Sequence, residues 1–325
     1  MNMMKKQNLV AMAFASALAV TSTAQAGDDV EVSVFIDVIA NTDGALVFGA
    51  DGEIDVSKKM GTVTVRVDAD VNLAINGGAN ADNALSSSGQ DSGRFEQAYF
   101  AWGATEGVTV LGGVFNNPIG QEAEDAPDMD FTSHSVTYNI LDGQTVASGN
   151  NVAGIAVAGA VGPATVTVAV VDDIGLATNT KGEGKLSTAA VVNFSPMKGL
   201  DLELGYVTQD GQAENVLDVN AKYAMGALTA GLDYLAADAA VDSATNLWAG
   251  FDVNDKVNVK VRYESVAFEA AGVDDSTRTT VYASYVINDN LSAALETSSG
   301  DNASGEGVSG IADDDVTTWE FIGTF

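Results

Sequence analysis

Residues 61–75 read Gly-Thr-Val-Thr-Val-Arg-Val-Asp-Ala-Asp-Val-Asn-Leu-Ala-Ile, and apolar and polar side chains alternate from Thr62 to Leu73. Successive side chains of an extended strand point to opposite faces, so one face carries Val and Leu and the other carries Thr, Arg and Asp. The stretch is longer than most strands of globular proteins. It predicts a long strand with one apolar face and one charged face.

The same period of two recurs along the chain. Val257, Val259 and Val261, for example, alternate with Asn258 and Lys260. We expect sixteen strands of this kind. They lie near residues 30–40, 45–57, 61–75, 93–104, 107–116, 151–160, 163–173, 186–195, 199–208, 216–225, 227–236, 245–253, 256–266, 278–287, 290–298 and 317–325.

The connections between these strands alternate between short and long. Short links such as 105–106, 226 and 288–289 contain turn residues, whereas the longest link runs from 117 to 150. This sorting is typical of a transmembrane, antiparallel, up-and-down β-barrel, which is apolar outside and polar inside. We therefore predict an all-β barrel of about 16 strands, with a range of 14–18. A soluble β-sandwich or a lipocalin-like domain is the alternative, and no helical period is evident after residue 26.

The first 26 residues have the pattern of a secretory signal peptide. Lys5 and Lys6 precede an apolar stretch from 9 to 20, and Ala24-Gln25-Ala26 supplies small residues for cleavage. A membrane helix is the alternative, but the apolar stretch is too short to span a bilayer. We expect residues 1–26 to be a signal peptide and residues 27–325 to form the barrel.

The composition excludes several classes of protein. The 325 residues include 45 Asp and Glu but only 14 Lys and Arg, which gives a formal charge of −31. Such an acidic chain is unsuited to nucleic acid, and its apolar content of 46% is too high for a disordered chain. It has no Cys, and His134 is its single His. The Ser residues beside His134 are its direct neighbours in the sequence, which does not suggest a catalytic Ser-His pair. We predict no enzyme, no cofactor and no dedicated metal site; loosely bound Ca²⁺ or Mg²⁺ at the acidic loops is the alternative.

The C-terminus carries aromatic side chains on one face of the last predicted strand. The chain ends Trp-Glu-Phe-Ile-Gly-Thr-Phe, with Trp319, Phe321 and Phe325 on the same parity. This ending resembles the signal by which bacterial outer-membrane proteins are recognised for insertion. It predicts the barrel assembly machinery as a partner and the bacterial outer membrane as the location.

A family resemblance enters at residues 93–142. Glu-Gln-Ala-Tyr at 96–99, Leu-Gly-Gly-Val-Phe-Asn-Asn-Pro-Ile-Gly-Gln-Glu at 111–122, and Ala-Pro-Asp at 126–128 resemble the signature of OmpL-like β-barrel porins. The phosphate-selective porins are more distantly similar. These families often carry Lys where this chain has Val114, and basic residues do not cluster in the chain. The resemblance implies a porin, whereas these two departures from the family pattern argue against anion selectivity. Many porins of this size are homotrimers.

The long loop at 117–150 is the expected constriction, because the corresponding loop of porins commonly folds into the lumen. It carries acids and no Lys or Arg, and acids in a narrow passage favour cations. A solvated loop outside the barrel is the alternative. The candidate constriction residues are Glu122, Glu124, Asp125, Asp128 and Asp130.

The polar faces of the predicted strands define the expected lumen. Its charged residues are Arg66, Asp68, Asp70, Asp201, Glu203, Lys222, Lys260, Arg262 and Glu264. This mixed lining predicts passive diffusion of small hydrophilic solutes through an outer-membrane porin that prefers cations. The alternative is a structural or adhesive barrel whose acidic outer loops bind divalent cations or surface partners. Membrane lipid and lipopolysaccharide are the other expected partners.

Overall fold

The computed structural model describes residues 30–42, 47–71, 73–74, 93–144, 150–172, 186–208, 215–237, 241–269, 272–302, 311 and 315–325. The predicted signal peptide, residues 1–26, lies outside these ranges. Within the described residues, no helix is long and apolar enough to cross a membrane.

Almost every described element is a β-strand, and the strand boundaries lie within a few residues of those predicted. The strands are β1 (Glu31–Asn41), β2 (Val47–Met60), β3 (Val63–Val71), β4 (Leu73–Ala74), β5 (Gly93–Thr105), β6 (Val108–Asn116), β7 (Asn151–Val161), β8 (Ala164–Asp172), β9 (Leu186–Met197), β10 (Leu200–Thr208), β11 (Val216–Met225), β12 (Leu228–Ala237), β13 (Val241–Asn254), β14 (Val257–Phe268), β15 (Ser276–Asn288), β16 (Leu291–Asp301) and β17 (Val316–Thr324).

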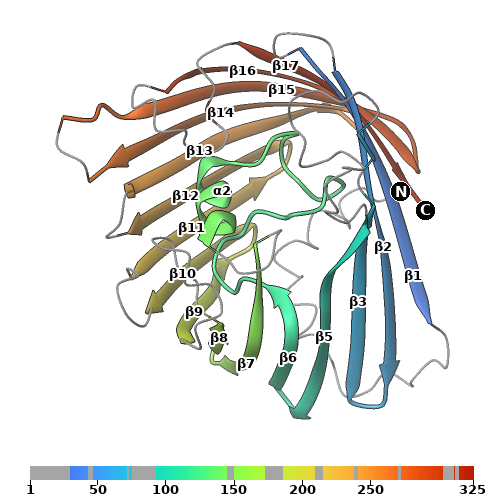
Figure 1. The fold of residues 1–325 in the computed structure, drawn as a ribbon, viewed down its shortest axis with the longest axis vertical. Coiled ribbons are helices and arrows are strands. Elements are labelled where there is room, and N and C mark those ends of the chain that lie inside the picture. The colour runs from blue at the N-terminus through green and yellow to red at the C-terminus, as the bar shows by residue number, and fades with distance from the viewer. Residues whose placement is uncertain are drawn as a thin grey trace.

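The strands form one closed antiparallel barrel (Figure 1). Each strand pairs with its neighbours in sequence, and β1 pairs with β17 to close the sheet, with Phe35 opposite Thr324. The short β4 continues β3 along β2, because Ala50 pairs with Leu73 in the register that joins Glu53 to Asp70. These two segments therefore make one wall strand, and the predicted sixteen-strand up-and-down barrel is confirmed.

Tight turns lie at one end of the barrel. Two-residue links join β2 to β3, β5 to β6, β7 to β8, β9 to β10, β11 to β12, β13 to β14 and β15 to β16. Gly107 and Gly226 have φ of 77° and 64° in these turns, a left-handed conformation that glycine adopts without steric cost. The predicted sorting of short and long connections is therefore present, and both described chain ends lie at the end with the tight turns.

Strand β14 shows how the wall separates two environments. Val261 and Tyr263 are each 49% exposed, whereas Arg262 and Glu264, which alternate with them, are 1% and 0% exposed. Exposed apolar side chains alternate in the same way on several other strands, as Leu232 and Tyr234 do on β12. Such a continuous apolar outer surface suits lipid rather than water.

Strand β5 contains a β-bulge that the periodicity of the sequence conceals. Asp68 pairs with Gln97 but Ala69 pairs with Phe95, so Glu96 is an extra residue on β5. Both Glu96 and Gln97 are consequently buried, while Phe95, Phe100 and Trp102 are exposed. One inserted residue exchanges the two faces, so the alternation of residues 93–104 does not by itself show which face of this strand is buried.

The long link between β6 and β7 contains a helix, α2 (Val136–Gln144), so the expectation that no helix follows residue 26 is wrong. The hydroxyl of Ser135 accepts a hydrogen bond from the amide of Tyr138 at 3.1 Å, which caps the helix N-terminus. The helix is only nine residues long, too short to give a clear period in the sequence.

The largest apolar core lies inside the barrel, beneath this link. Ile119, Val136 and Leu141 of the link are buried against wall residues such as Val207 on β10 and Leu235 on β12. Gly205 on β10 makes room for the contact, since a Cβ there would collide with Ile119. Contrary to the simple expectation of a polar interior, this part of the lumen wall is therefore apolar.

Candidate functional site

The link 117–150, called the inner loop below, lies inside the barrel in its described part (Figure 1). Its neck is closed by Asn117 and Asn150, whose backbones are joined by an N–H···O bond of 2.7 Å and whose side chains are joined at 3.1 Å. Helix α2 packs against β12, β13 and β14. The loop therefore crosses the lumen and meets the wall on more than one side.

One side of the wall, on β11, β14 and β15, carries four bases that hold the loop. We call Lys222, Lys260, Arg262 and Arg278 the basic wall. The Nζ atoms of Lys222 and Lys260 lie 2.7 and 2.9 Å from the two carboxylate oxygens of Asp130. Burial by itself would raise the pKa of Asp130, but Lys260 and Lys222 outweigh it and lower the pKa to about 2.

The guanidinium groups of the basic wall bind the loop backbone. Arg262 donates to the carbonyl of Ser133 at 2.8 Å, and Arg278 donates to the carbonyl of His134 at 2.6 Å. Glu264 lies between the two arginines and accepts from Arg278 and from the amide of Val136, the first residue of α2, at 2.8 Å. The N-terminus of the helix is thus fixed by a buried carboxylate.

Aromatic side chains pack over the same bases. Phe131 of the loop lies edge-on to Trp248 and near Tyr282, with ring centroids 6.1 and 5.6 Å apart. The guanidinium carbon of Arg262 is 4.4 Å from the centre of the Phe131 ring. Cation–π contacts of this kind stabilise desolvated bases and withdraw them from water.

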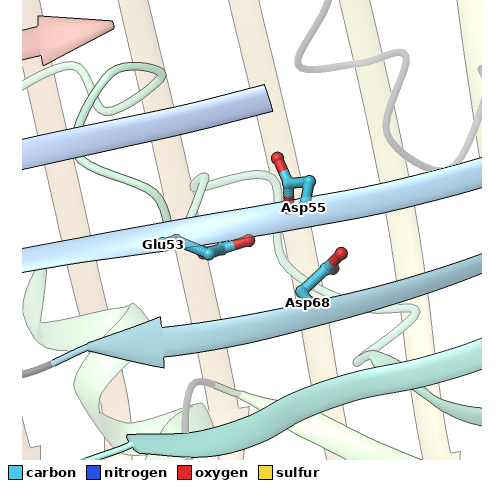
Figure 2. A group of neighbouring side chains, drawn as sticks. All are labelled: Glu53, Asp55 and Asp68. Atoms are coloured by element: carbon cyan, nitrogen blue, oxygen red, sulfur yellow. The ribbon is translucent and has the colours of Figure 1, made fainter. Parts of the chain in front are cut away.

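The opposite side of the wall, on β2, β3 and β5, is acidic. We call Glu53, Asp55, Asp68 and Glu96 the acidic wall. Figure 2 shows Glu53 and Asp55 on β2 beside Asp68 on the neighbouring β3. Arg66 on β3 donates from Nε to both oxygens of Asp68, at 2.7 and 2.8 Å, and from a terminal nitrogen to Asp55 at 2.8 Å. One guanidinium therefore faces several carboxylates here.

The inner loop adds further acids to this side. The side-chain amide of Asn151 donates to Glu96 at 3.1 Å and to Glu124 at 3.4 Å. One carboxylate oxygen of Asp125 lies within 4.8 Å of one carboxylate oxygen of Glu53 and one of Glu96. Burial and the neighbouring carboxylate of Glu96 raise the pKa of Glu124. Burial also raises the pKa of Asp125.

The five candidate constriction residues are thus in different environments. Glu122 accepts from the amide of Ser135 at 2.9 Å and contacts His134; burial would raise its pKa, but the contact with His134 outweighs it and lowers the pKa. Asp130 is paired with the basic wall, and Glu124 and Asp125 face the acidic wall. Asp128 is exposed, and its backbone amide donates to the carbonyl of Asp125 at 2.9 Å.

The nine candidate lumen residues lie on strands and mostly on the inner face. Those that contact the inner loop directly are Glu203, Lys222, Lys260, Arg262 and Glu264. Arg66 and Asp68 pair with each other, Asp201 accepts from Ser195, and Asp70 lies opposite Arg94 in the register.

Several residues outside the nine candidate lumen residues also hold the loop. Glu296 on β16 accepts from the amide of Thr132 at 3.0 Å, and Glu320 on β17 accepts from the Thr132 hydroxyl at 2.9 Å. Thr137 donates to Asp233 on β12. Their inward parity was visible in the sequence, but the loop residues that they bind were not. The aromatic residues Trp319, Phe321 and Phe325 are all about half exposed or more.

Comparison with known proteins identifies solved structures with a similar fold. By sequence, the chain matches no family profile and no curated protein. By structure, it is similar to OprB of Pseudomonas putida, at 10% identity and a TM-score of 0.69 over 91% of this chain and 94% of that chain. It is also similar to Salmonella typhi OmpF in complex with daunomycin, at 11% identity and a TM-score of 0.69 over 91% and 97%.

A mutant of the Rh. blastica porin is a third similar structure. It shares 15% identity and a TM-score of 0.59 over 91% of this chain and all of that chain. Identities this low establish the fold only. No finding supports the OmpL-like assignment in particular. The closed barrel, its inner loop and these three neighbours together show that the chain has the fold of the sixteen-stranded porins.

Proposed function

We propose that the protein is an outer-membrane channel through which small hydrophilic solutes diffuse passively. The observation that carries the proposal is a charged loop held inside a closed barrel whose outer surface is apolar. Arg66, Lys222 and Asp130 of the interior have side chains that are 32%, 34% and 30% exposed, so water reaches charges of both signs there. A wetted, charged interior inside an apolar outer surface suits polar solutes.

We further propose that the passage prefers cations. The two arginines of the basic wall are withdrawn from water, since Arg262 and Arg278 are 1% and 5% exposed and both bind the loop. The more exposed Lys222 is paired with Asp130. The acidic side keeps more carboxylates than Arg66 can pair, and Asp128 of the loop is exposed. The field left in the passage would then be negative, which attracts cations and repels anions.

Reversal potentials across a planar bilayer in a KCl gradient test both proposals. The purified protein should conduct, and the sign should indicate K⁺ over Cl⁻. The variant Asp128→Asn, which removes an exposed carboxylate of the inner loop, should reduce this preference, whereas Asp242→Asn, which removes an exposed carboxylate on β13, should not. Chloride preference in the wild type would refute cation selectivity. A protein that inserts but never conducts would favour the structural or adhesive barrel.

The location and partners belong to the same proposal. Residues 1–26 would direct export, and the exposed aromatics Trp319, Phe321 and Phe325 would present the last strand to the barrel assembly machinery. Lipid and lipopolysaccharide would then surround the apolar outer surface, and a homotrimer would match many porins of this size. The finer assignment, to the OmpL-like porins, rests on the sequence resemblance at residues 93–142 alone.

A further inference from the structure

The acidic side of the lumen contains two overlapping groups of three carboxylates. Glu53, Asp55 and Asp68 form one, and Glu53, Glu96 and Asp125 form the other. In each group, one oxygen from every residue lies within 4.8 Å of the others. Oxygens on opposite sides of a Ca²⁺ ion are about 4.8 Å apart, because Ca–O distances are about 2.3–2.6 Å.

The first group already has a cation. Arg66 binds Asp68 with two hydrogen bonds and Asp55 with one, and it lies 3.8 Å from Glu53. Its guanidinium therefore balances these carboxylates in the folded protein. A metal ion is not needed to explain this group.

The second group differs because Glu96 and Asp125, its members other than Glu53, form no ion pair with any described base. Within the described side chains, Glu96, Glu124 and Asp125 form no ion pair with Lys, Arg or His. Glu96 is 7% exposed and Glu53 is 3% exposed. Buried carboxylates this close repel one another unless protons or a cation separate them.

A second observation at this place points to a bound group. The hydroxyl of Tyr138 on α2 is buried, the residue being 5% exposed, and it has no hydrogen-bond partner among the described residues. The carboxylates in its surroundings are those of Glu124, Asp142, Glu122 and Glu96, the last of which belongs to the second group. A buried hydroxyl without a partner is unusual in a folded protein. A water molecule held by a cation would supply the missing acceptor, since Ca²⁺ commonly keeps water among its ligands.

We propose that Glu53, Glu96 and Asp125 bind one Ca²⁺ ion between the inner loop and the acidic wall, with Glu124 and Tyr138 beside it. Carboxylate oxygens are the ligands that hard divalent cations prefer. Glu53 and Glu96 come from β2 and β5, whereas Asp125 comes from the loop, so the ion would fasten the loop to the wall opposite the basic wall. This goes beyond the proposed function, because binding does not depend on conduction.

Isothermal titration calorimetry of the purified full-length protein in detergent, first freed of metal with a chelator, tests the site with CaCl₂. We expect one Ca²⁺ per chain. Glu96→Gln and Asp125→Asn should each weaken binding at least tenfold. Asp242→Asn is the matched control, because it removes one exposed carboxylate outside the cluster, and its affinity should equal that of the wild type.

The two site variants separate binding from folding. Glu96→Gln alters a wall strand, whereas Asp125→Asn alters only the loop and leaves every strand of the barrel unchanged. The absence of stoichiometric binding in the wild type would overturn the proposal. Unchanged affinity in Asp125→Asn, or an equal loss in Asp242→Asn, would also overturn it, since either result would show that the ion binds elsewhere.

Discussion

The basic wall and the acidic wall hold the same loop in opposite ways. On the basic wall, opposite charges meet: Asp130 lies between Lys222 and Lys260, and Glu264 contacts both Arg262 and Arg278. On the acidic wall, like charges meet, and Arg66 is the base that the described contacts place among them. The first arrangement stabilises the loop by pairing, whereas the second leaves negative charge that a mobile cation can neutralise.

The difference separates anchoring from selectivity. A base that binds a loop carbonyl and stacks on Phe131, as Arg262 does, is lost to passing solutes. An ionised carboxylate without a fixed partner still attracts cations electrostatically. Under the proposed function, the buried bases immobilise the loop and the excess acids face the ions that pass or bind.

The largest expected effect comes from breaking the basic wall at Glu264. Glu264→Ala leaves two buried guanidinium groups without their paired carboxylate and the amide of Val136 without its acceptor. Removing one partner of a buried pair costs about 3–5 kcal/mol. We expect the inner loop to detach while the barrel remains folded. Hydrogen exchange of residues 131–142 should then accelerate, and the channel current should become noisier.

The matched control for this variant is Glu53→Ala on the acidic wall. It removes a carboxylate of similar burial whose neighbours are mainly other carboxylates. In Ca²⁺-free buffer, the exchange of residues 131–142 should change far less. Equal acceleration in both variants would show that the two walls anchor the loop alike, and the comparison would fail.

Asp130→Asn should have the next largest effect, because it leaves the charges of Lys222 and Lys260 uncompensated beside the passage. A unit charge at about 4 Å in water changes an ion's energy by about 1 kcal/mol, or roughly fivefold in population. We expect the K⁺/Cl⁻ permeability ratio to fall by up to about this factor. A ratio equal to that of the wild type would mean that these lysines do not face the passage.

The pKa of Asp130 also sets the pH range of this anchor. Its pKa in the folded protein is about 2, below the ordinary value of 3.8, so the carboxylate is favoured by folding. The stability that this pair contributes is therefore complete above the ordinary pKa and is lost as the pH falls through about 2. Loop exchange at residues 131–142 should be insensitive to this group from pH 7 to pH 5. Acceleration of wild-type exchange within that range, absent in Asp130→Asn, would contradict this assignment.

The barrel could be predicted from the sequence because each strand faces lipid on one side and the lumen on the other, so apolar and polar residues alternate along it. Residues 61–75 and 256–266 are examples, and both lie within or beside observed strands. The bulge at Glu96 could not be predicted, because one inserted residue reverses the parity of everything after it on β5.

The site was only partly predictable for a different reason. The charges of the loop and of the wall are visible in the sequence, but their pairing depends on contacts over 90 residues or more, as between Asp130 and Lys222. The sequence does not distinguish Asp130 from Glu124, because both are acidic residues of the inner loop. The fold gives one of them two lysines and the other a second glutamate.

The smallest expected effect comes from the acidic wall, where Asp55→Asn is the same chemical change as Asp130→Asn. Arg66 keeps its two hydrogen bonds to Asp68, and the Asp55 side chain is 21% exposed, so the lost pair is worth about 1 kcal/mol or less. The substitution also removes repulsion from Glu53, which opposes that loss. Urea unfolding in detergent should therefore give nearly the wild-type free energy. A loss of several kcal/mol would show that the acidic wall, like the basic wall, is held together by its ion pairs.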